Sequence, residues 1–320
     1  MSLRLLMMGT GGFALPTFLH LCDSSHDVVG LVTQPDRTGR GHHHHVSMLK
    51  TAAEERGISV FQPASANDAE ALLRLRDFNA DLFVVAAYGQ LLSAQLLALP
   101  RLGAINVHAS LLPKYRGAAP VVYAILHGET ETGVSIFRIE PRLDAGPVLG
   151  IVSTPIGPKE TAGELEERLS QLAPQLVLEV IERIERGTAE AVAQDPLLVS
   201  NAPRLRKEHG AIDWSQQPQV IERHIRAMQP WPKPFTFLHS EGHPSLRLLV
   251  LDVDPVQFDD DAAAAGQLTV TDEQRLLVRT GGGYVQIIQL QPAGKRSMSA
   301  AEFLRGHAMQ TGDFLGPSPA

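Results

Sequence analysis

An apolar run that leads straight into a glycine-rich turn opens the chain, and it limits the possible folds more than any other feature. Residues 3–8 are mostly apolar, residues 9–12 read Gly-Thr-Gly-Gly, residues 13–22 have a helical pattern, and residues 28–33 form a second apolar run. Strand, turn, helix and strand in this order make a βαβ unit, which builds a parallel sheet covered by helices. We therefore expect an α/β fold in the first part of the chain.

Further segments continue this pattern. Buried strands are expected at 82–87, 104–108, 133–138 and 148–154, and helices at 47–56, 68–77, 119–127 and 161–186. The polar, glycine-containing stretch 34–46 is expected to be a loop. Open α/β sheets bind ligands beyond the carboxyl ends of their strands, so the polar residues that end the run 104–108 point to a site there.

The second part of the chain has a different character. Prolines 196 and 203 interrupt the pattern, and we interpret residues 194–206 as a linker between two domains, 1–193 and 207–320. Short alternating apolar runs separated by turn signals follow the linker, at 246–253, 266–270, 276–278 and 284–290. This spacing predicts a small β-barrel or sandwich.

The composition excludes several classes of protein. The formal net charge is −7, and from Leu205 onward 11 Lys and Arg stand against 13 Asp and Glu, so any attraction to nucleic acid must come from local basic patches. The one cysteine, Cys22, cannot form an internal disulfide and fits a reducing compartment. No apolar run reaches the roughly 18 residues of a membrane helix. We expect a cytoplasmic protein that does not bind membranes.

Two interpretations of the glycine turn remain open. It lacks the full G-x-G-x-x-G pattern of dinucleotide-binding proteins because residue 14 is alanine, and Thr33 and Gln34 stand where that pattern needs an acidic residue. The turn is either a tight connection between strand and helix or a place where backbone amides approach a ligand. The incomplete pattern argues against a nicotinamide-dependent oxidoreductase.

The strand at 104–108 carries the strongest candidates for chemistry. Asn106 and His108 are two residues apart and therefore point to the same face of a strand. An amide and a protonated imidazole together suit a developing oxyanion. Asp144 precedes a Gly-Pro turn and either caps that turn or orients and charges His108. Sequence distance does not decide between these two roles.

Four consecutive histidines, His42 to His45, stand in the predicted loop. Neutral imidazoles bind metals, but adjacent histidines lack the usual ligand spacing and no acidic or cysteine partner is near. We predict no metal site. A loop that meets a polyanion fits better, with Arg37 and Arg40 supplying permanent charge.

Nine short motifs give the chain a resemblance to a known family. They span nearly its whole length and stand at 8–14, 33–37, 87–90, 106–113, 115–120, 132–135, 143–147, 291–298 and 303–306. In these motifs the chain resembles the methionyl-tRNA formyltransferase family, which is part of the folate-dependent formyltransferases. The segment Asn-x-His-x-Ser-Leu-Leu-Pro with a downstream Leu-Asp-x-Gly is its most specific element.

The resemblance implies a Rossmann-like formyltransferase domain followed by an OB-like barrel, and it implies roles for named residues. The catalytic residues would be Asn106, His108 and Asp144. The folate would contact Ala86, Ala87, Tyr88, Gly89, Gln90, Leu91, Ser110, Leu111, Leu112, Pro113 and Leu143. Transfer RNA would contact Arg37, Arg40, His42, His43, Lys207, Lys295 and Arg296.

The implied activity is transfer of a formyl group from 10-formyltetrahydrofolate, as co-substrate, to the amino group of initiator methionyl-tRNA for translation initiation. We expect a monomer that needs no metal. A sugar-nucleotide or glycinamide amine is an alternative acceptor, although glycinamide enzymes lack a C-terminal barrel with the 293–298 segment. Hydrolysis of 10-formyltetrahydrofolate by water is another alternative. A non-enzymatic RNA-binding module would leave Asn106, His108 and Asp144 without a purpose.

Overall fold

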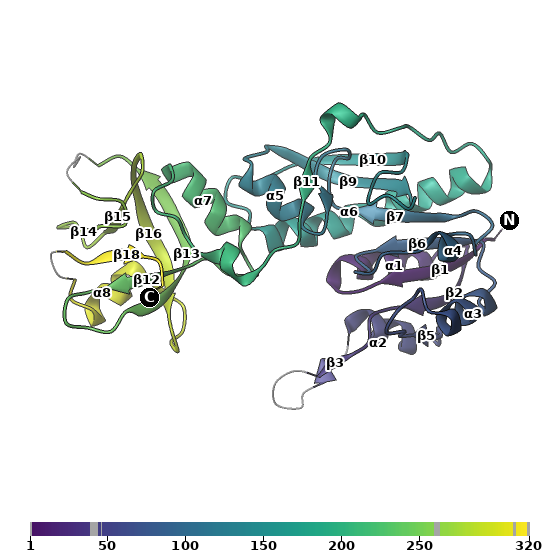
Figure 1. Cartoon of the computed structure of the whole chain (residues 1–320), viewed down its shortest axis with the longest axis horizontal. Coiled ribbons are helices and arrows are strands. Elements are labelled where there is room, and N and C mark those ends of the chain that lie inside the picture. Colours follow the sequence, from purple (N-terminus) through teal and green to yellow (C-terminus); the bar gives the residue numbers. More distant parts are fainter. Residues whose placement is uncertain (1, 39–43, 46, 259–262, 310–311, 319–320) are drawn as a thin grey trace. The chain divides into compact units, whose positions relative to one another are not determined.

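The chain folds into two compact units (Figure 1). The computed structural model describes residues 2–38, 44–45, 47–258, 263–309 and 312–318. The N-terminal unit comprises Met1–Val121, Thr130–Ile156 and Glu164–Pro203, and the C-terminal unit comprises Val122–Glu129, Gly157–Gly163 and Arg204–Ala320. Within the described ranges, no helix has both the length and the apolar composition needed to cross a bilayer.

A seven-stranded sheet forms the centre of the N-terminal unit, in the order β10-β9-β7-β6-β1-β2-β5. Its strands are β1 (Arg4–Gly9), β2 (Asp27–Val32), β5 (Val60–Phe61), β6 (Leu82–Ala86), β7 (Ala104–His108), β9 (Glu131–Arg138) and β10 (Val148–Pro155). The predicted parallel sheet is confirmed from β7 to β5, whereas β9 and β10 add an antiparallel edge.

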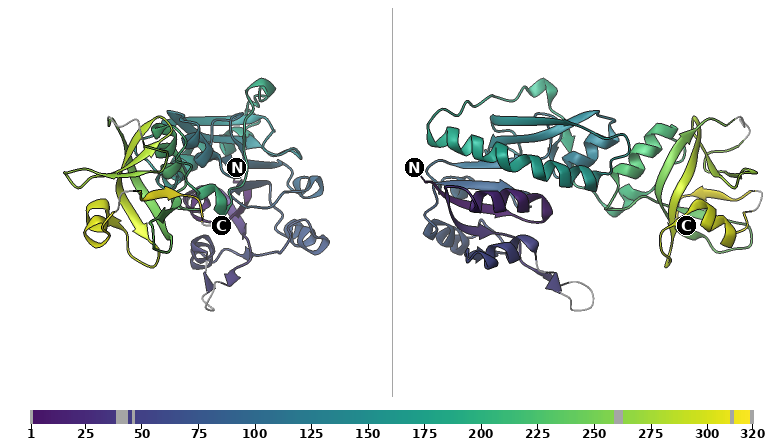
Figure 2. Two further views of the ribbon diagram at one scale, coloured as in Figure 1. Left: turned by 60° about the vertical axis from the view of Figure 1, so that its left-hand side comes forward. Right: turned by 180° about the vertical axis from the view of Figure 1, so that it is seen from behind.

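Helices cover both faces of this sheet because its central strands are apolar on both faces. Leu5 to Met8 of β1 are all fully buried. On one face, Leu6 and Met8 pack in a cluster with α3 and α4. Figure 2 shows the long helix α6 running along the sheet. The helices of this unit include α1 (Leu15–Cys22), α2 (Met48–Glu55), α3 (Ala69–Asp77), α4 (Ala94–Leu97) and α6 (Ala162–Glu185), while α5 (Pro120–Leu126) passes into the C-terminal unit.

The glycine turn is a close-packed connection between β1 and the short 3-10 helix η1 (Gly12–Ala14). A Cβ on Gly9 would lie 2.8 Å from the Cβ of Ala14 and 3.0 Å from the carbonyl oxygen of Ala86, so only glycine fits there. Gly11 has φ +77°, which a side chain would strain. Packing and backbone conformation therefore explain these two glycines without a phosphate ligand.

The C-terminal unit is a nearly closed antiparallel barrel, which confirms the predicted barrel. Its strands are β12 (Phe235–His239), β13 (Leu246–Val256), β14 (Leu268–Val270), β15 (Leu276–Thr280), β16 (Gly283–Pro292), β17 (Met298–Ser299) and β18 (Phe314–Gly316). Six of them follow the order β14-β15-β16-β13-β12-β18, and β17 pairs with β16. Leu315 donates a backbone hydrogen bond to Gly266 at 2.8 Å, which joins the two edges. Helices α7 (Pro218–Ala227) and α8 (Ala300–Gly306) pack onto its apolar core.

Two short strand pairs lie outside these sheets. Within the predicted loop 34–46, β3 (Arg37–Thr38) pairs with β4 (His44–His45), so part of this stretch is an antiparallel ladder. The predicted linker contains a 3-10 helix, η2 (Pro196–Leu198), and β11 (Asn201–Ala202). β11 runs parallel to β8 (Arg116–Gly117), so this part of the chain returns to the N-terminal unit.

Candidate active site

Asn106 and His108 project from one face of β7, near its carboxyl end. Phe137 of β9 lies opposite Asn106 in the sheet, and its ring packs edge-on against the His108 ring with centroids 6.3 Å apart. The Asn106 side chain is half-buried, and among the residues that the structure describes none forms a hydrogen bond with its amide. This amide is therefore available to a ligand.

Asp144 reaches the same place from the turn between β9 and β10. Its Oδ2 lies 3.8 Å from Nδ1 of His108 and accepts a hydrogen bond from the Gly117 amide at 2.8 Å. The two ionisable side chains are nearly buried, with 6% and 11% of their surfaces exposed. The fold thus brings together the three residues predicted to be catalytic. Asp144 contacts both His108 and the backbone, whereas the sequence left open which of these it would serve.

The His108 ring has a defined tautomer. Its Nε2 lies 2.9 Å from the carbonyl oxygen of Tyr115, and because a carbonyl only accepts, Nε2 carries the proton and donates it. Burial lowers the pKa of His108, and the opposing effects of the Asp144 charge and the Tyr115 hydrogen bond do not offset it. The Asp144 charge does favour the protonated ring, as one of the two interpretations of Asp144 required, but burial has the larger effect on the pKa in the free protein. This direction favours the neutral ring, in which Nδ1 carries no proton and faces Asp144.

The residues predicted to contact folate form two segments, and Leu143 lies apart from both. The first, Ala86 to Leu91, continues from β6, and Ala87 has a left-handed backbone with φ +47°. Gln34 donates a hydrogen bond from Nε2 to the Tyr88 carbonyl at 3.0 Å and fixes this segment. In the described part of the chain, no residue accepts a hydrogen bond from the N–H of Gly89, Gln90 or Leu91.

The second segment runs from Ser110 to Pro113, and hydrogen bonds of two buried serines stabilise it. The Ser110 side chain is fully buried, and its hydroxyl donates to the Lys114 carbonyl at 2.7 Å. Ser135 accepts from the Leu112 amide at 3.0 Å and donates to the Ser110 carbonyl at 2.7 Å. Ser110 therefore shapes this segment through its hydroxyl, while Leu111 and Pro113 are half-buried. Leu143, beside Asp144, is 55% exposed.

The residues predicted to contact tRNA lie in different parts of the chain. The backbone of Arg37 belongs to β3, and Arg40, His42 and His43 lie outside the described residues. Lys207 and Lys295 are exposed in the C-terminal unit, and neither forms an ion pair with a described residue. Arg296 pairs with Glu302 at 2.8 Å, and its charge is therefore partly compensated.

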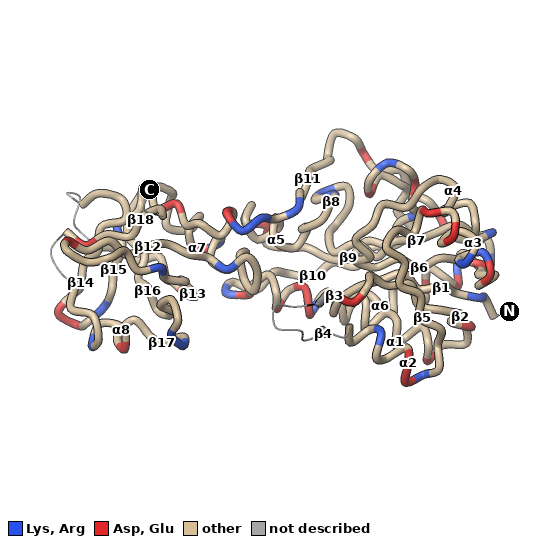
Figure 3. Tube along the Cα trace, turned by 60° about the horizontal axis from the view of Figure 1, so that its bottom comes forward, with Lys and Arg blue, Asp and Glu red and all other residues tan. Residues whose placement is uncertain are grey.

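Lysine, arginine and acidic residues are interspersed along the trace of the C-terminal unit (Figure 3). Two further arginines of this unit, Arg223 and Arg226, are only partly exposed. Arg226 forms a nearly buried ion pair with Glu222 at 2.6 Å, and the guanidinium of Arg223 packs near Gly128 with a buried Nε. The local basic surface of this unit is therefore smaller than the sequence indicated.

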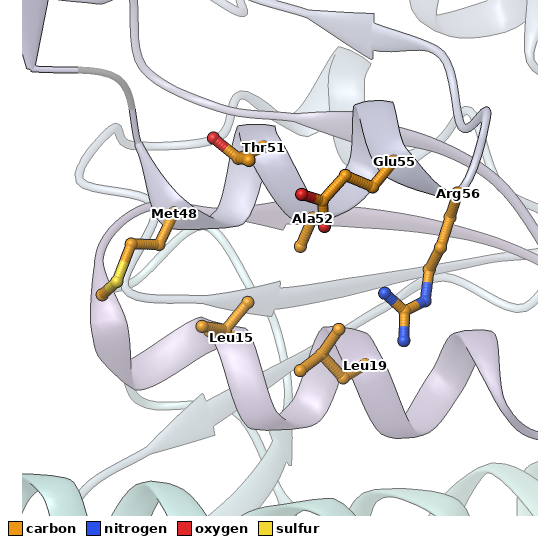
Figure 4. A pocket seen from close by; sticks show the side chains of 7 residues that line it. All are labelled: Leu15, Leu19, Met48, Thr51, Ala52, Glu55 and Arg56. Carbon is orange, nitrogen blue, oxygen red and sulfur yellow. The ribbon is translucent and has the colours of Figure 1, made fainter.

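A hollow of about 330 Å³ lies between α1 and α2 (Figure 4). Its lining mixes apolar and charged side chains: Leu15, Leu19, Met48, Thr51, Ala52, Glu55 and Arg56. None of these residues belongs to the motifs that indicated chemistry. Within the described ranges, no group of three or more His, Cys, Asp or Glu side chains has the geometry to hold a metal ion.

Sequence reasoning missed three residues of the site. Tyr115 fixes the His108 tautomer through its carbonyl, Gly117 anchors the Asp144 carboxylate, and Gln194 binds the carbonyl oxygens of Asp144 and Gly146. Tyr115 and Gly117 stand in the motif at 115–120, but their contributions come from the backbone and leave no chemical signal in the sequence. Gln194 stands in a stretch without any motif.

Comparison with known proteins agrees with this architecture. Residues 3–181 match the formyl transferase family, and residues 204–308 match the family described as the C-terminal domain of formyl transferase. Fold, site and sequence therefore define the chain as a formyl transferase.

Within that class, the chain belongs to the methionyl-tRNA formyltransferase family. It is 40% identical to the methionyl-tRNA formyltransferase of Citrifermentans bemidjiense over 320 residues, which cover 100% of this chain and 98% of the relative. It is 39% identical to that of Geobacter metallireducens over 316 residues, with coverage of 98% and 99%. The solved structure of WlaRD, a sugar 3N-formyl transferase, has the same fold, with a TM-score of 0.65, 17% identity and coverage of 92% of this chain and 100% of that one.

Proposed function

We propose that this protein transfers the formyl group of 10-formyltetrahydrofolate to the amino group of methionyl-tRNA. The observation that carries the proposal is the convergence of Asn106, His108 and Asp144 at the end of β7, with His108 Nδ1 3.8 Å from Asp144 Oδ2. The choice of acceptor is supported by full-length relatives named methionyl-tRNA formyltransferase, at 40% and 39% identity.

The site residues have complementary roles in an acyl transfer. The acceptor amine attacks the formyl carbon, and a tetrahedral intermediate with a negative oxygen forms. The Asn106 amide, which has no partner among the described residues, donates a hydrogen bond to that oxygen. Removing one such donor typically costs about 10²–10³ in rate.

His108 acts as the base in this proposal. Its bare Nδ1 takes the proton that the attacking nitrogen loses, while Nε2–H stays bound to the Tyr115 carbonyl. The imidazolium that forms is stabilised by the Asp144 carboxylate. The same proton then passes to N10 of the folate as the C–N10 bond breaks, which yields tetrahydrofolate and the formylated amine. No covalent enzyme intermediate is needed.

We propose that the pterin ring binds against the backbone of the segment Ala86 to Leu91. A pterin presents both hydrogen-bond donors and acceptors along its edge, and a backbone with free N–H groups can match it. The N–H groups of Gly89, Gln90 and Leu91 are available in the described structure. Gln34 holds this segment through the Tyr88 carbonyl and therefore prepares it for the ligand.

Phosphate contacts are proposed for Arg37, Arg40, Lys207 and Lys295, and for His42 and His43 of the loop. Each Lys or Arg that meets a phosphate releases a counterion, so Lys295→Ala should weaken tRNA binding and lower the slope of log K against log salt by about 1. Lys159→Ala is the matched control, because Lys159 is already paired with Asp252 and Asp254. Equal salt slopes for both variants would remove Lys295 from the interface. We place this reaction in the cytoplasm and expect one chain per enzyme molecule.

The alternative acceptor is the amine of a sugar nucleotide. It is considered because WlaRD, a sugar 3N-formyl transferase, has the same fold. The test is incubation with formyl-labelled 10-formyltetrahydrofolate and either charged initiator tRNA, a nucleotide-linked amino sugar, or buffer alone. Label on methionyl-tRNA is expected. Label on the sugar alone would refute the tRNA assignment, and release of formate at an equal rate in buffer would indicate a hydrolase.

A further inference from the structure

The chain returns to the active site after α6, in the stretch that the sequence marked as a linker. This return segment, residues 192–202, ends in β11, which pairs with β8 (Figure 3). Ser200 accepts the amide hydrogen of Tyr115 with its hydroxyl oxygen at 2.9 Å and that of Arg116 with its carbonyl at 2.9 Å. The residue that fixes the His108 tautomer, Tyr115, is thus itself held by the return segment.

Gln194 is the most fully bonded side chain of this segment. Its Oε1 accepts two hydrogen bonds from the Arg116 guanidinium, at 3.0 Å from Nε and 2.7 Å from Nη2. Its Nε2 donates to the carbonyl oxygens of Asp144 at 2.8 Å and Gly146 at 2.7 Å. A glutamine side chain has two donor hydrogens and two acceptor lone pairs, so every position is used. Its orientation is fixed as well, because a guanidinium only donates and a carbonyl only accepts.

These four hydrogen bonds support the position of the Asp144 carboxylate indirectly, in two ways. The bonds from Nε2 fix the backbone of the turn from which the carboxylate projects. The bonds to Oε1 fix Arg116, whose neighbour Gly117 donates its amide hydrogen to Asp144 Oδ2 at 2.8 Å. Asp144 itself has φ +46°, an uncommon backbone conformation that persists only where the surroundings hold it.

We propose that Gln194 is a positioning residue that keeps the Asp144 carboxylate within reach of His108 Nδ1. It touches neither substrate nor reacting atoms and acts through the turn that carries Asp144 and through Arg116. The kinetic consequence rests on the proposed function, whereas the geometric consequence, the effect of Asp144 on the His108 ring, does not.

The test replaces Gln194 with methionine, which keeps the length of the side chain and removes all four bonds. Without its supports the Asp144 carboxylate moves away from His108, and the pKa of His108 should fall further because Asp144 raises it in the native protein. The pKa is measured by NMR titration of the imidazole, assigned by comparison with His108→Gln. The value of kcat should fall by about 10- to 100-fold, with KM for both substrates within about threefold of the unsubstituted protein.

Two further variants keep the test decisive. Gln175→Met is the matched control, since Gln175 bonds only Glu179 on the exposed side of α6, and it should change neither quantity. Gln194→Asn keeps the amide but is too short to span Arg116 and the turn. It replaces Gln194→Met in the test if the methionine variant does not fold, and the same fall in the His108 pKa and in kcat is expected.

An unchanged His108 pKa in folded Gln194 variants would overturn the proposal, even if kcat were reduced, because the residue would then only support the fold. The titration needs no substrate and therefore separates the two hypotheses. If the unsubstituted protein transferred no formyl group, the proposed function would fail, while a shifted His108 pKa would still support the positioning role.

Discussion

Replacing Asp144 with asparagine removes one negative charge from the site and little else. The two side chains have the same shape, and the amide oxygen of asparagine still accepts the hydrogen bond that Gly117 donates to Oδ2 at 2.8 Å. The turn and the return segment therefore keep their contacts. Any change in rate then reports the loss of the carboxylate charge opposite His108 Nδ1.

The distance between the two groups sets the size of the effect. At 3.8 Å, and with an effective dielectric constant of about 20 for nearly buried groups, one unit charge stabilises the opposite charge by about 4 kcal/mol. About 1.4 kcal/mol corresponds to a tenfold change in rate, so full loss on a complete imidazolium is about 10³-fold. Because the proton is only partly transferred to His108 in the transition state, we expect kcat to fall by about 10²- to 10³-fold.

The assay is single-turnover formyl transfer to methionyl-tRNA at saturating 10-formyltetrahydrofolate, with folate affinity measured separately. Folate binding should change by less than about threefold, since the charge acts on the proton transfer and not on the pterin. Asp68→Asn is the control, because Asp68 is exposed and its side chain makes no capping hydrogen bond. A loss of kcat below about tenfold for Asp144→Asn would refute the argument that this carboxylate stabilises charged His108.

Three further measurements test the site and the packing of the sheet. Asn106→Ala should lower kcat by about 10²- to 10³-fold with folate affinity retained, and equal losses in both would mean that Asn106 holds the ligand instead. His108 should titrate below its usual value of 6.5 in an NMR experiment on the free protein, because burial disfavours the imidazolium, and a pKa above 6.5 would contradict the neutral resting ring. Gly30→Ala would place a Cβ 2.3 Å from the Phe78 ring and should cost about 1–3 kcal/mol in urea unfolding, whereas Gly12→Ala meets no atom within 4 Å and should be nearly neutral.

Local patterns in the sequence predict most elements of the N-terminal unit. The predicted strand at 104–108 coincides with β7, and the first strand, turn, helix and strand correspond to β1, η1, α1 and β2. Such elements are readable because strands buried on both faces need continuous apolar runs. Amino-acid composition does not indicate whether a strand runs parallel or antiparallel to its neighbour. The antiparallel arrangement of β9 and β10 could therefore be seen only in the structure.

In the C-terminal unit, local sequence patterns predict only some of the strands and none of the helices. Strands β13 to β16 were predicted, whereas β12, β18 and the helices α7 and α8 were not. β18 has three residues, too few for a periodic signal, and β12 follows a proline-rich stretch. α8 did carry a signal, since Ser299 and Glu302 form a capping box at its start.

By itself, the sequence determined the α/β class, the barrel and the pair Asn106 and His108, because residues two apart on one strand share a face whatever surrounds them. Tertiary structure alone decided that Asp144 and Gln194, distant along the chain, meet at that strand. It also decided the direction in which the pKa of His108 is shifted. A nearby carboxylate favours the protonated ring and burial disfavours it, and only the packed structure determines which effect is larger.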